Sequence, residues 1–539
     1  MESAAKVDRT SGSAVGVYGW GVVAPGARDV RAFGALLEGG GTALVPGSEA
    51  HVGQALFPVG DPDFSFDDYA AWIAERHGET YLARMRTKMG ENVQFAVGAM
   101  IQALGCDPRL EATIRELDDA CHVLVGSGVG DLPESYRASA ALERATRRWN
   151  HFWAQPSRCA SRRRFEAEGV APAGAAPPAN PESLPVDSDE RLEARAAWDA
   201  HWARQSDELR VFLERFAAIE RTSGEGDESD KAHLGAIRRR LRAEHALVEE
   251  FGCPEPPWTA VSPNLMWNIQ NAPAAQITML LGIHGAAWAP VGACSTFGVA
   301  LKCGRDAIVR GEAKMVIVGT TDPRPDPALV AAFHQARVMP ATGDVNVPFT
   351  SLRGTHLSGG ACVWVLGDAR WCAQRGLRPV GGYVEAVALS SDAEHIITPS
   401  KTGPRRAISR AYEEARVTPA DVAVVDLHAT GTPGDLNELA LVDDFITART
   451  RVTARKGQLG HGMSNSGGWE LTALALSLSR GAALPTCIRA ADLHPRVPRP
   501  DAIVTEEAPL DGRVGVKLML GIGGITACVV LRGVPPERG

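Results

Sequence analysis

The sequence predicts an α/β protein made of two similar halves, with a large helical insertion in the first half. Short apolar strand patterns alternate with helical patterns near both ends of the chain, which is typical of a sheet with mostly central strands. The alternation stops near residue 134 and resumes at Val261. A second run of the same kind begins near Gly381, so the two runs look like variations on one plan.

The first half begins with the apolar strand pattern VGVYGWGVV at residues 15–23. A helix is expected over residues 31–37, and apolar residues at helical spacing predict another over residues 89–104. Residues 122–125 form a short apolar strand that runs into the loop Gly126-Ser-Gly-Val-Gly130.

Residues 134–258 are predicted to be a helical insertion, because they contain almost no strand signal. The expected helices lie near residues 134–153, 191–221 and 231–250. A Pro- and Ala-rich stretch at 171–185 is interpreted as a linker. The segment 191–221 carries a stripe of Leu192, Trp198, Trp202, Leu209, Phe212, Leu213, Phe216 and Ile219. We interpret this stripe as the packing face of an inserted helical hairpin. A face that binds a partner or covers substrate is the alternative.

The remaining strands and helices divide the chain into an N-terminal half, residues 1–133 and 259–378, and a C-terminal half, residues 379–539. Strands are expected at residues 313–319, 360–366, 381–389, 422–427, 515–520 and 527–531, and helices at residues 404–416 and 468–480.

Composition excludes several classes of protein. Fifty-six basic and 64 acidic residues give a net charge of −8, which argues against nucleic-acid binding through clustered cations. No apolar stretch is long enough for a membrane span, and no secretory signal is visible. The ten cysteines contain no C-x-x-C pair, so we expect reduced thiols and neither disulfides nor a zinc site. These observations predict a large cytoplasmic enzyme.

A candidate nucleophile is Cys294 in the segment Val-Gly-Ala-Cys-Ser-Thr-Phe-Gly. Small residues precede this cysteine and a helical pattern follows it, which places the thiol at a turn that opens a helix. The free N–H groups and the dipole of a helix start favour a thiolate, the form that attacks a thioester. A buried cysteine packed among small residues is the alternative interpretation.

Two histidines strengthen the prediction of a catalytic site. His428 follows the apolar pattern VAVVDL and begins the loop HATGTPGD, while His461 ends the segment Lys456-Gly-Gln-Leu-Gly-His461. One cysteine and two histidines can divide the roles of nucleophile, proton carrier and hydrogen-bond donor. The Gly-rich loop 520–527 lets the backbone approach another group closely, but it does not fit a dinucleotide site.

These four elements, in this order, resemble the β-ketoacyl-acyl carrier protein synthases of the thiolase superfamily, in particular the elongating type with a Cys-His-His triad. The matching segments are GACS at 292–295, HATGTP at 428–433, the K-x-x-x-G-H pattern at 456–461 and GIGGIT at 521–526. The resemblance implies a thiolase-like fold with two similar βαβαβ halves in α-β-α-β-α layers. A large helical insertion would be added to that fold.

The resemblance also implies a role for each matched residue. Cys294 would take an acyl group from the phosphopantetheine arm of an acyl carrier protein. His428 and His461 would donate hydrogen bonds to a malonyl-type thioester. Lys456, paired with Glu470, would position the histidines. The backbone N–H groups of Cys294 and of Ile522, which stands at the family's gate position, would form the oxyanion hole. The implied substrate-binding residues are Thr430, Thr432, Gly521, Gly523 and Asn271.

The function implied is decarboxylative Claisen condensation in fatty-acid-like or polyketide biosynthesis. The partners would be acyl carrier protein and acyl and malonyl thioesters, in a homodimer or a heterodimer, with no bound cofactor, metal, nucleic acid or membrane. Ile522 replaces the family's gating Phe, Ala429 replaces a Gly, and Thr350 stands where the family has Asp.

These departures keep two alternatives open. One is an acyltransferase that does not decarboxylate, and the other is a non-catalytic partner subunit like a chain-length factor. We further hypothesise that the insertion caps or reshapes the acyl tunnel or a carrier-protein dock.

Overall fold

The computed structural model describes residues 14–44, 49–52, 55–172, 176–222, 230–340, 342–396 and 400–534. The chain forms two compact units, which are described separately. The first comprises the residues up to Pro133 together with those from Met266 onward, and the second is Glu134–Leu265.

The first unit contains two sets of five strands that follow the same plan. The N-terminal set runs in the order β5-β4-β6-β7-β1, and the C-terminal set in the order β10-β9-β13-β14-β8. The N-terminal strands are β1 Val15–Val23, β4 Cys121–Gly126, β5 Ala287–Trp288, β6 Met315–Asp322 and β7 Gly360–Asp368. The C-terminal strands are β8 Tyr383–Ser391, β9 Val422–Asp426, β10 Arg451–Thr453, β13 Val514–Gly521 and β14 Ile525–Arg532.

The pairing directions of the two sets also correspond. In each half the first strand in the chain, β1 or β8, pairs antiparallel with the last strand, β7 or β14. The last strand also pairs antiparallel with its other neighbour, β6 or β13. The remaining neighbours pair parallel. The sets meet through the pair Gly16–Tyr383 of β1 and β8. The prediction of two similar halves is therefore confirmed.

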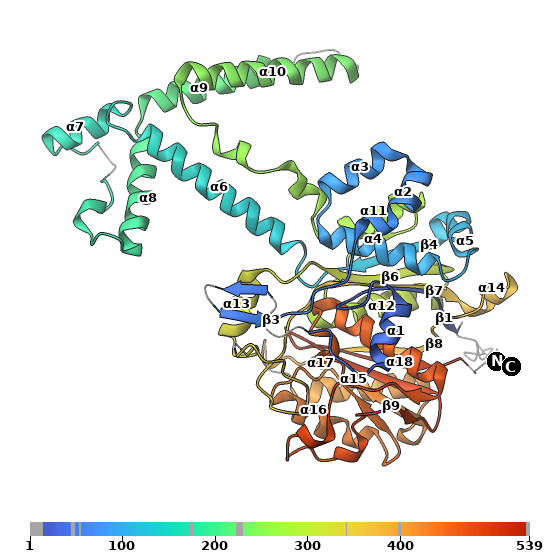
Figure 1. Ribbon diagram of the computed structural model, residues 1–539. Helices are drawn as coiled ribbons and strands as arrows, with labels where there is room; N and C mark the ends of the chain where they lie inside the picture. The colour runs from blue at the N-terminus through green and yellow to red at the C-terminus, as the bar shows by residue number, and fades with distance from the viewer. Residues whose placement is uncertain are drawn as a thin grey trace, which may run out of the picture. The chain divides into compact units, whose positions relative to one another are not determined.

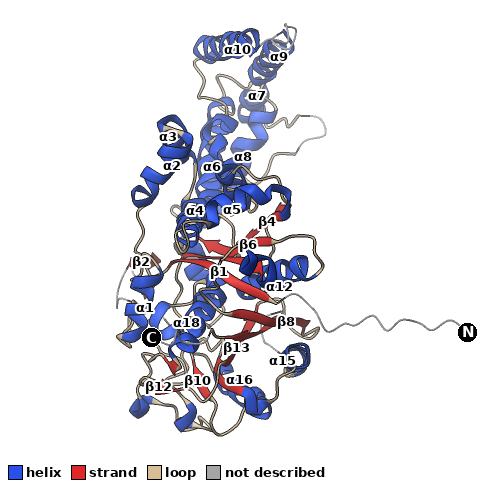
Figure 2. Ribbon diagram, turned by 90° about the vertical axis from the view of Figure 1, so that its right-hand side faces the viewer, coloured by secondary structure: helices blue, strands red, loops and turns tan. Residues whose placement is uncertain are grey.

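The helices form layers around these strands (Figures 1 and 2). The helices α4 (Glu91–Leu104) and α11 (Ala272–Leu281) cover the outer face of the N-terminal set. The helices α15 (Thr402–Ala415) and α16 (Gly434–Val442) pack outside the C-terminal set. Two further helices, α12 (Thr296–Val309) and α18 (Ser466–Arg480), share a core with both sets of strands. This is the expected α-β-α-β-α arrangement.

The central layer has a large apolar core. Phe297 of α12 and Trp469 of α18 are fully buried with Trp364 of β7 and Val529 of β14. Because such burial contributes about 1.5–3 kcal/mol per large side chain, this layer holds the two halves together.

The other elements of the first unit are α1 Val30–Glu38, β2 Glu49–Val52, β3 Ala55–Pro58, α2 Ala70–His77, α3 Glu79–Lys88, α5 Leu110–Leu117, α13 Pro327–Gln335, α14 Ala369–Gln374, α17 Lys456–Leu459, β11 Ala482–Ala483 and β12 Ala508–Pro509.

The regular secondary structure in the described residues of the second unit is helical, with loops between the helices. Its helices are α6 Leu132–Trp153, α7 Ala160–Glu168, α8 Asp189–Arg204, α9 Asp207–Thr222 and α10 Asp230–Phe251, the first of which begins two residues before the boundary. Part of the predicted linker, residues 173–175, lies outside the described residues. None of the described helices in either unit combines the length and apolar character that crossing a membrane requires.

The single helix predicted over residues 191–221 is wrong, because the chain breaks between α8 and α9. Ser206 causes the break: its hydroxyl accepts a hydrogen bond from the backbone of Leu209 and donates to the carbonyl of Arg158. A serine that caps the next helix competes with continuation of the previous one. Trp198, Trp202, Leu209, Phe212 and Phe216 of the predicted stripe are buried in the cores of this unit, while Leu192 and Leu213 are exposed.

Candidate active site

Cys294 lies in a short turn, Ala293–Ser295, directly before α12. Ala293 has a φ of 49°, a left-handed conformation that is uncommon for a residue with a side chain. The turn packs against the loop that follows β13, where a Cβ on Gly521 would lie 2.7 Å from the Gly292 carbonyl oxygen. Glycine at 521 therefore lets this loop lie directly against the Cys294 turn.

His428 is held by backbone hydrogen bonds to α16. Glu438 accepts from the backbone nitrogens of His428, at 2.6 Å, and Ala429, at 2.8 Å. Asp435 accepts from those of Thr430, at 2.9 Å, and Gly431, at 3.0 Å. Two carboxylates from the first turns of one helix thus fix the whole loop after β9.

His461 follows the one-turn helix α17 and is held by the segment before β7. Its backbone nitrogen donates to the carbonyl of His356 at 2.5 Å, and its carbonyl accepts from Ser358 at 3.0 Å. The backbone N–H of Met463 donates to His461 Nδ1 at 3.1 Å. Because this N–H can only donate, the proton of the neutral His461 ring lies on Nε2.

Lys456 binds behind the first imidazole. Its Nζ lies 2.8 Å from Glu470 Oε1 and 3.4 Å from His428 Nδ1, and it also donates to the backbone carbonyl of His428. These three acceptors satisfy the three N–H bonds of the ammonium. Since the ammonium can only donate, His428 Nδ1 is an acceptor, and the proton of its neutral ring also lies on Nε2.

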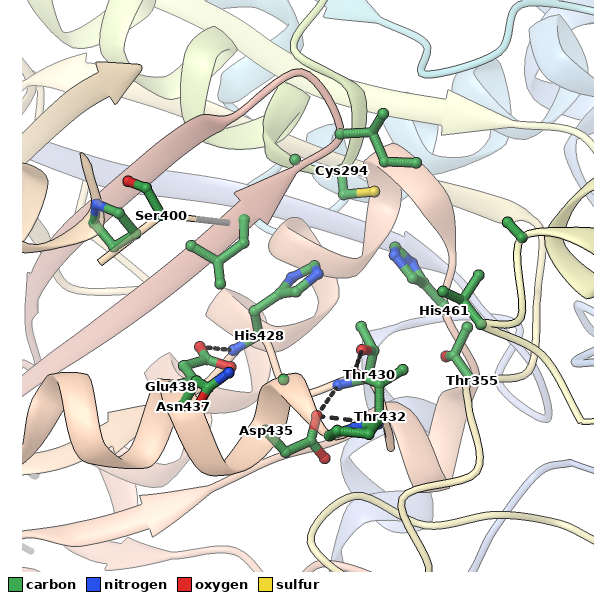
Figure 3. A pocket seen from close by; sticks show the side chains of 18 of the residues that line it. Cys294, Thr355, Ser400, His428, Thr430, Thr432, Asp435, Asn437, Glu438 and His461 are labelled. Carbon is green, nitrogen blue, oxygen red and sulfur yellow. Dashed lines mark hydrogen bonds between the residues drawn. The ribbon is translucent and has the colours of Figure 1, made fainter. Parts of the chain in front are cut away.

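The two imidazoles point toward the space in front of the Cys294 thiol (Figure 3). Their ring centroids are 5.5 Å apart and the rings are nearly perpendicular, at 82°. This space belongs to a cavity of about 590 Å³, a size suited to a small-molecule group. The cavity-lining residues include Cys294, Phe333, Lys401, His428, Thr430, Thr432, His461 and Ile522.

Burial determines the protonation of the three reactive groups. It lowers the pKa of His428 and of His461 well below the ordinary histidine value, and the positive charge of Lys456 lowers both further. Burial raises the pKa of the Cys294 thiol to about 11, although Lys456 and the backbone N–H groups of Ile522 and Cys294 act in the opposite direction. The backbone N–H groups at the helix start thus favour the thiolate, as expected, but the lost hydration outweighs them.

The arrangement combines one nucleophile, two hydrogen-bond donors and two backbone N–H groups that interact with the sulfur. Such a site can form and break a thioester and can stabilise an oxyanion or an enolate. Within the described ranges, no three His, Cys, Asp or Glu side chains are grouped so that they could hold a metal ion.

Two family matches cover the segments that carry these residues. Residues 251–370 match the family Beta-ketoacyl synthase, N-terminal domain, and include Cys294. Residues 382–488 match Beta-ketoacyl synthase, C-terminal domain, and include His428, Lys456 and His461. The two matched segments, which together make up less than half of the chain, thus carry both domains of the β-ketoacyl synthase family.

Curated β-ketoacyl synthases are similar to about half of this chain. The 3-oxoacyl-[acyl-carrier-protein] synthase 2 of Staphylococcus aureus (strain COL) is 28% identical over 278 residues, which cover 49% of this chain and 66% of that protein. The protein of the same name from Mycobacterium leprae is 29% identical over 277 residues, which cover 49% of this chain and 65% of that protein. The alignments thus span just under two thirds of these relatives.

Solved structures are similar over nearly the whole chain. A β-ketoacyl synthase from Burkholderia phymatum has a TM-score of 0.67 at 16% identity and covers 97% of this chain and 100% of its own. The ishigamide ketosynthase/chain length factor has a TM-score of 0.65 at 20% identity, with the same coverage. At these identities the similarity shows the fold.

In the structure, most of the candidate residues taken from the sequence lie together. Seven line the cavity, namely Cys294, His428, Thr430, Thr432, His461, Gly521 and Ile522. Lys456 and Glu470 form a buried ion pair behind them. Gly523 lies in the same loop but outside the lining, with a φ of 92°. Asn271 is exposed at the start of α11 and does not line the cavity.

The sequence analysis missed five buried charged residues that support the site. They are Asp322, Asp426, Asp435, Glu438 and Lys517. Asp435 belongs to the segment HATGTPGD, and an acidic residue beside a Gly/Thr loop indicates that it accepts from loop N–H groups. The other four carry no local signal that singles them out.

Proposed function

We propose that this chain catalyses decarboxylative condensation of an acyl-Cys294 intermediate with a malonyl-type thioester. The observation that carries this proposal is the pair of neutral imidazoles, each with its Nε2–H directed at the space in front of one thiol. Two neutral donors can hold a thioester carbonyl oxygen and stabilise an enolate without protonating it.

The first step is acyl transfer to Cys294. Its sulfur attacks the acyl carbonyl of a carrier thioester, the carbon–sulfur bond to the carrier breaks, and the departing thiol receives the proton that the cysteine loses. Since the pKa of Cys294 is raised to about 11, this proton must move during the attack. The backbone N–H groups of Cys294 and Ile522 lie where they can stabilise the oxyanion.

The second step forms the new carbon–carbon bond. His428 and His461 donate to the thioester carbonyl of the malonyl-type substrate, and the bond between its α-carbon and its carboxylate breaks. CO2 leaves, and the electron pair remains on the enolate. The enolate carbon then attacks the acyl carbonyl on Cys294 and expels the thiolate, which takes up a proton.

The cavity fits a phosphopantetheine arm as the carrier of both thioesters. Thr430 and Thr432 line it with hydroxyl groups, and the exposed Lys401 can bind a phosphate where the cavity opens. We therefore propose acyl carrier protein as the partner, in the cytoplasm, and thioester chemistry that needs no metal or bound cofactor.

The edge of the N-terminal set of strands supports a proposal of dimerisation. Both residues of the edge strand β5 are exposed, and Met279, Trp288 and Val291 expose 51%, 43% and 50% of their surface. An unpaired, apolar strand edge favours pairing with another chain. We propose that the chain forms a homodimer. Light scattering measures the molar mass of the chain by itself and of the chain with a co-expressed partner, and a dimer that forms only with the partner would indicate a heterodimer.

Mass spectrometry after mixing with acyl- and malonyl-carrier proteins tests the activity. Condensation requires an acyl adduct on Cys294 followed by CO2 and a β-ketoacyl product, and Cys294→Ala should form no adduct. Loading without loss of CO2 would indicate an acyltransferase. The absence of any adduct would indicate a non-catalytic subunit.

The insertion requires a separate test. We propose that the insertion influences acyl selectivity or carrier-protein binding. The residues that line the Cys294 cavity all belong to the first unit, so deletion of the insertion tests this role without removing the cavity lining. A soluble variant lacking residues 140–250 should then load a different range of acyl chains or bind carrier protein more weakly. Unchanged selectivity and affinity would contradict this role.

A further inference from the structure

Lys517 is a fully buried cation in an apolar strand. It is the fourth residue of β13, VGVKLMLG, and its side chain has no exposed surface. An unpaired buried charge costs several kcal/mol, so such a lysine persists only with close partners. The sheet register places it beside Asp426 of β9.

Three acceptors surround the Lys517 ammonium. Its Nζ lies 2.8 Å from Asp426 Oδ1, 2.7 Å from Glu470 Oε2 and 3.0 Å from the Leu427 carbonyl oxygen. Burial acts to lower the pKa of Lys517, but the carboxylates of Asp426 and Glu470 outweigh it and raise the pKa above the ordinary value. Lys517 is therefore charged. It donates hydrogen bonds to Asp426 and to the Leu427 carbonyl and forms an ion pair with Glu470.

Glu470 joins this lysine to the catalytic site. Its Oε1 binds Lys456 at 2.8 Å and its Oε2 binds Lys517 at 2.7 Å, so the two cations hold one carboxylate from both sides. Asp426 also accepts from the Thr453 hydroxyl at 2.7 Å and lies 3.9 Å from Arg455 Nε. The network contains three cations and two carboxylates, all buried, which leaves one excess positive charge.

The network acts on both imidazoles, and its member Lys456 also acts on the Cys294 thiol. Lys517 is among the charges that lower the pKa of His428 and of His461, after burial and Lys456. The titratable groups around the site are Cys294 before α12, Asp322 of β6, His356 before β7, Asp426 of β9, Asp435 and Glu438 of α16, Arg455 and Lys456 at α17, Glu470 of α18 and Lys517 of β13.

We propose that Lys517 is a second positioning residue of this site: it holds Glu470 against Lys456 and keeps the charge behind Cys294, His428 and His461 positive. Without it, two carboxylates would balance Lys456 and Arg455, and Glu470 Oε2 would lose its partner. The consequence for catalysis depends on the proposed function, but the effect on the electrostatics of the thiol does not.

The rate of Cys294 alkylation by iodoacetamide at pH 8 tests the proposal, because it follows the thiolate fraction and needs no acyl donor. Lys517→Met removes the excess positive charge and should slow alkylation about two- to fivefold. Asp426→Asn adds positive charge and should accelerate it about as much. The double variant Lys517→Met/Asp426→Asn restores the original charge and should react within about twofold of the native enzyme. Lys314→Met, at a partly exposed lysine before β6, is the control and should not change the alkylation rate.

A structural defect alone would shift all three variants in the same direction, so a double variant that does not return toward the native rate would overturn the proposal. An unchanged rate in a folded Lys517→Met protein would also overturn it. If Lys517→Met does not fold, Asp426→Asn compared with the double variant still isolates the Lys517 charge, and equal rates would contradict its role. Mass spectrometry of the products separately reports whether these proteins condense, so failure of the proposed reaction is distinguishable.

Discussion

The carboxylate of Asp322 accepts a hydrogen bond from the backbone nitrogen of Ser464 at 2.8 Å and so joins the two halves of the fold beside His461. The same oxygen accepts from the Ser464 hydroxyl at 2.5 Å, and the other oxygen accepts from the Ser127 hydroxyl at 2.7 Å. The backbone nitrogens of Gly128 and Val129 complete the set. One buried carboxylate therefore binds both the Gly-rich loop after β4 and the loop that carries the second histidine.

Asp322→Asn should destabilise the protein and impair condensation. An amide can accept on one side only, so it leaves the donors of Ser464 or those of the loop after β4 without an acceptor, at a cost of about 2–4 kcal/mol. Because a small displacement of His461 misaligns its Nε2–H, we expect condensation to fall about tenfold or more. Melting temperature and single-turnover condensation measure the two effects.

Ser464→Ala provides a graded control for this variant. It removes the hydroxyl donor and keeps the backbone bond to Asp322, so it should cost about 1 kcal/mol and leave condensation within about threefold. If both variants behave alike, the carboxylate does not position His461.

Alkylation of Cys294 should depend steeply on pH. Because the pKa of the thiol is raised to about 11, the thiolate fraction at neutral pH is small and increases about tenfold with each pH unit. The iodoacetamide rate should therefore rise about a hundredfold between pH 7 and pH 9. Peptide mass spectrometry separates Cys294 from the other nine cysteines, and Cys294→Ala identifies the peptide. A rate that is constant over this range would mean that the resting group is already a thiolate.

The two reaction steps should respond differently to loss of His461. His461→Ala removes a donor to the malonyl-type carbonyl, so condensation should fall about a hundredfold or more. Acyl loading of Cys294 should fall by less than about tenfold, because the backbone N–H groups of Cys294 and Ile522 that serve loading stay in place. Stopped reactions analysed for acyl-enzyme and β-ketoacyl product separate the two rates, and an equal loss of both would contradict this role.

The strands and the reactive residues could be predicted because their signals are local. The apolar strand at Val15–Val23 and the loop that starts at His428 each occupy a few adjacent residues whose pattern fixes their conformation. The break at Ser206 was missed because the apolar stripe continues across it, although serine followed by acidic residues is a helix-start signal.

The supporting charges could not be predicted because their partners are distant in the chain. Asp322 binds Ser464 across 142 residues, and Lys517 binds Asp426 across 91. A lone lysine in an apolar strand has no meaning until the sheet register places a carboxylate beside it. The effect of burial on the pKa of Cys294 could not be predicted either, since the degree of burial depends on the packed structure.

Glu438 gives the stability of the native enzyme a distinctive pH dependence. Burial raises its pKa from 4.5 to about 7, although the N–H groups of Ala429 and His428 lower it. A carboxyl whose pKa is raised by folding stabilises the folded state below its unfolded pKa, and this contribution is lost as the pH rises through the folded value. Its contribution should therefore decline between about pH 4.5 and pH 7, by up to about 3 kcal/mol.

Glu438→Gln removes this titration and tests it by difference. Gln can accept from only one of the two N–H groups, so the variant should melt below the native enzyme at pH 5. As the pH rises to 8, the native enzyme loses the contribution of protonated Glu438 and the variant does not, so the gap in melting temperature should narrow or reverse. Titrations of groups that do not interact with Glu438 cancel in the comparison; Asp435, whose charge acts on Glu438, is the exception. A gap that is constant from pH 5 to pH 8 would show that Glu438 is ionised throughout and that its hydrogen bonds outweigh its burial.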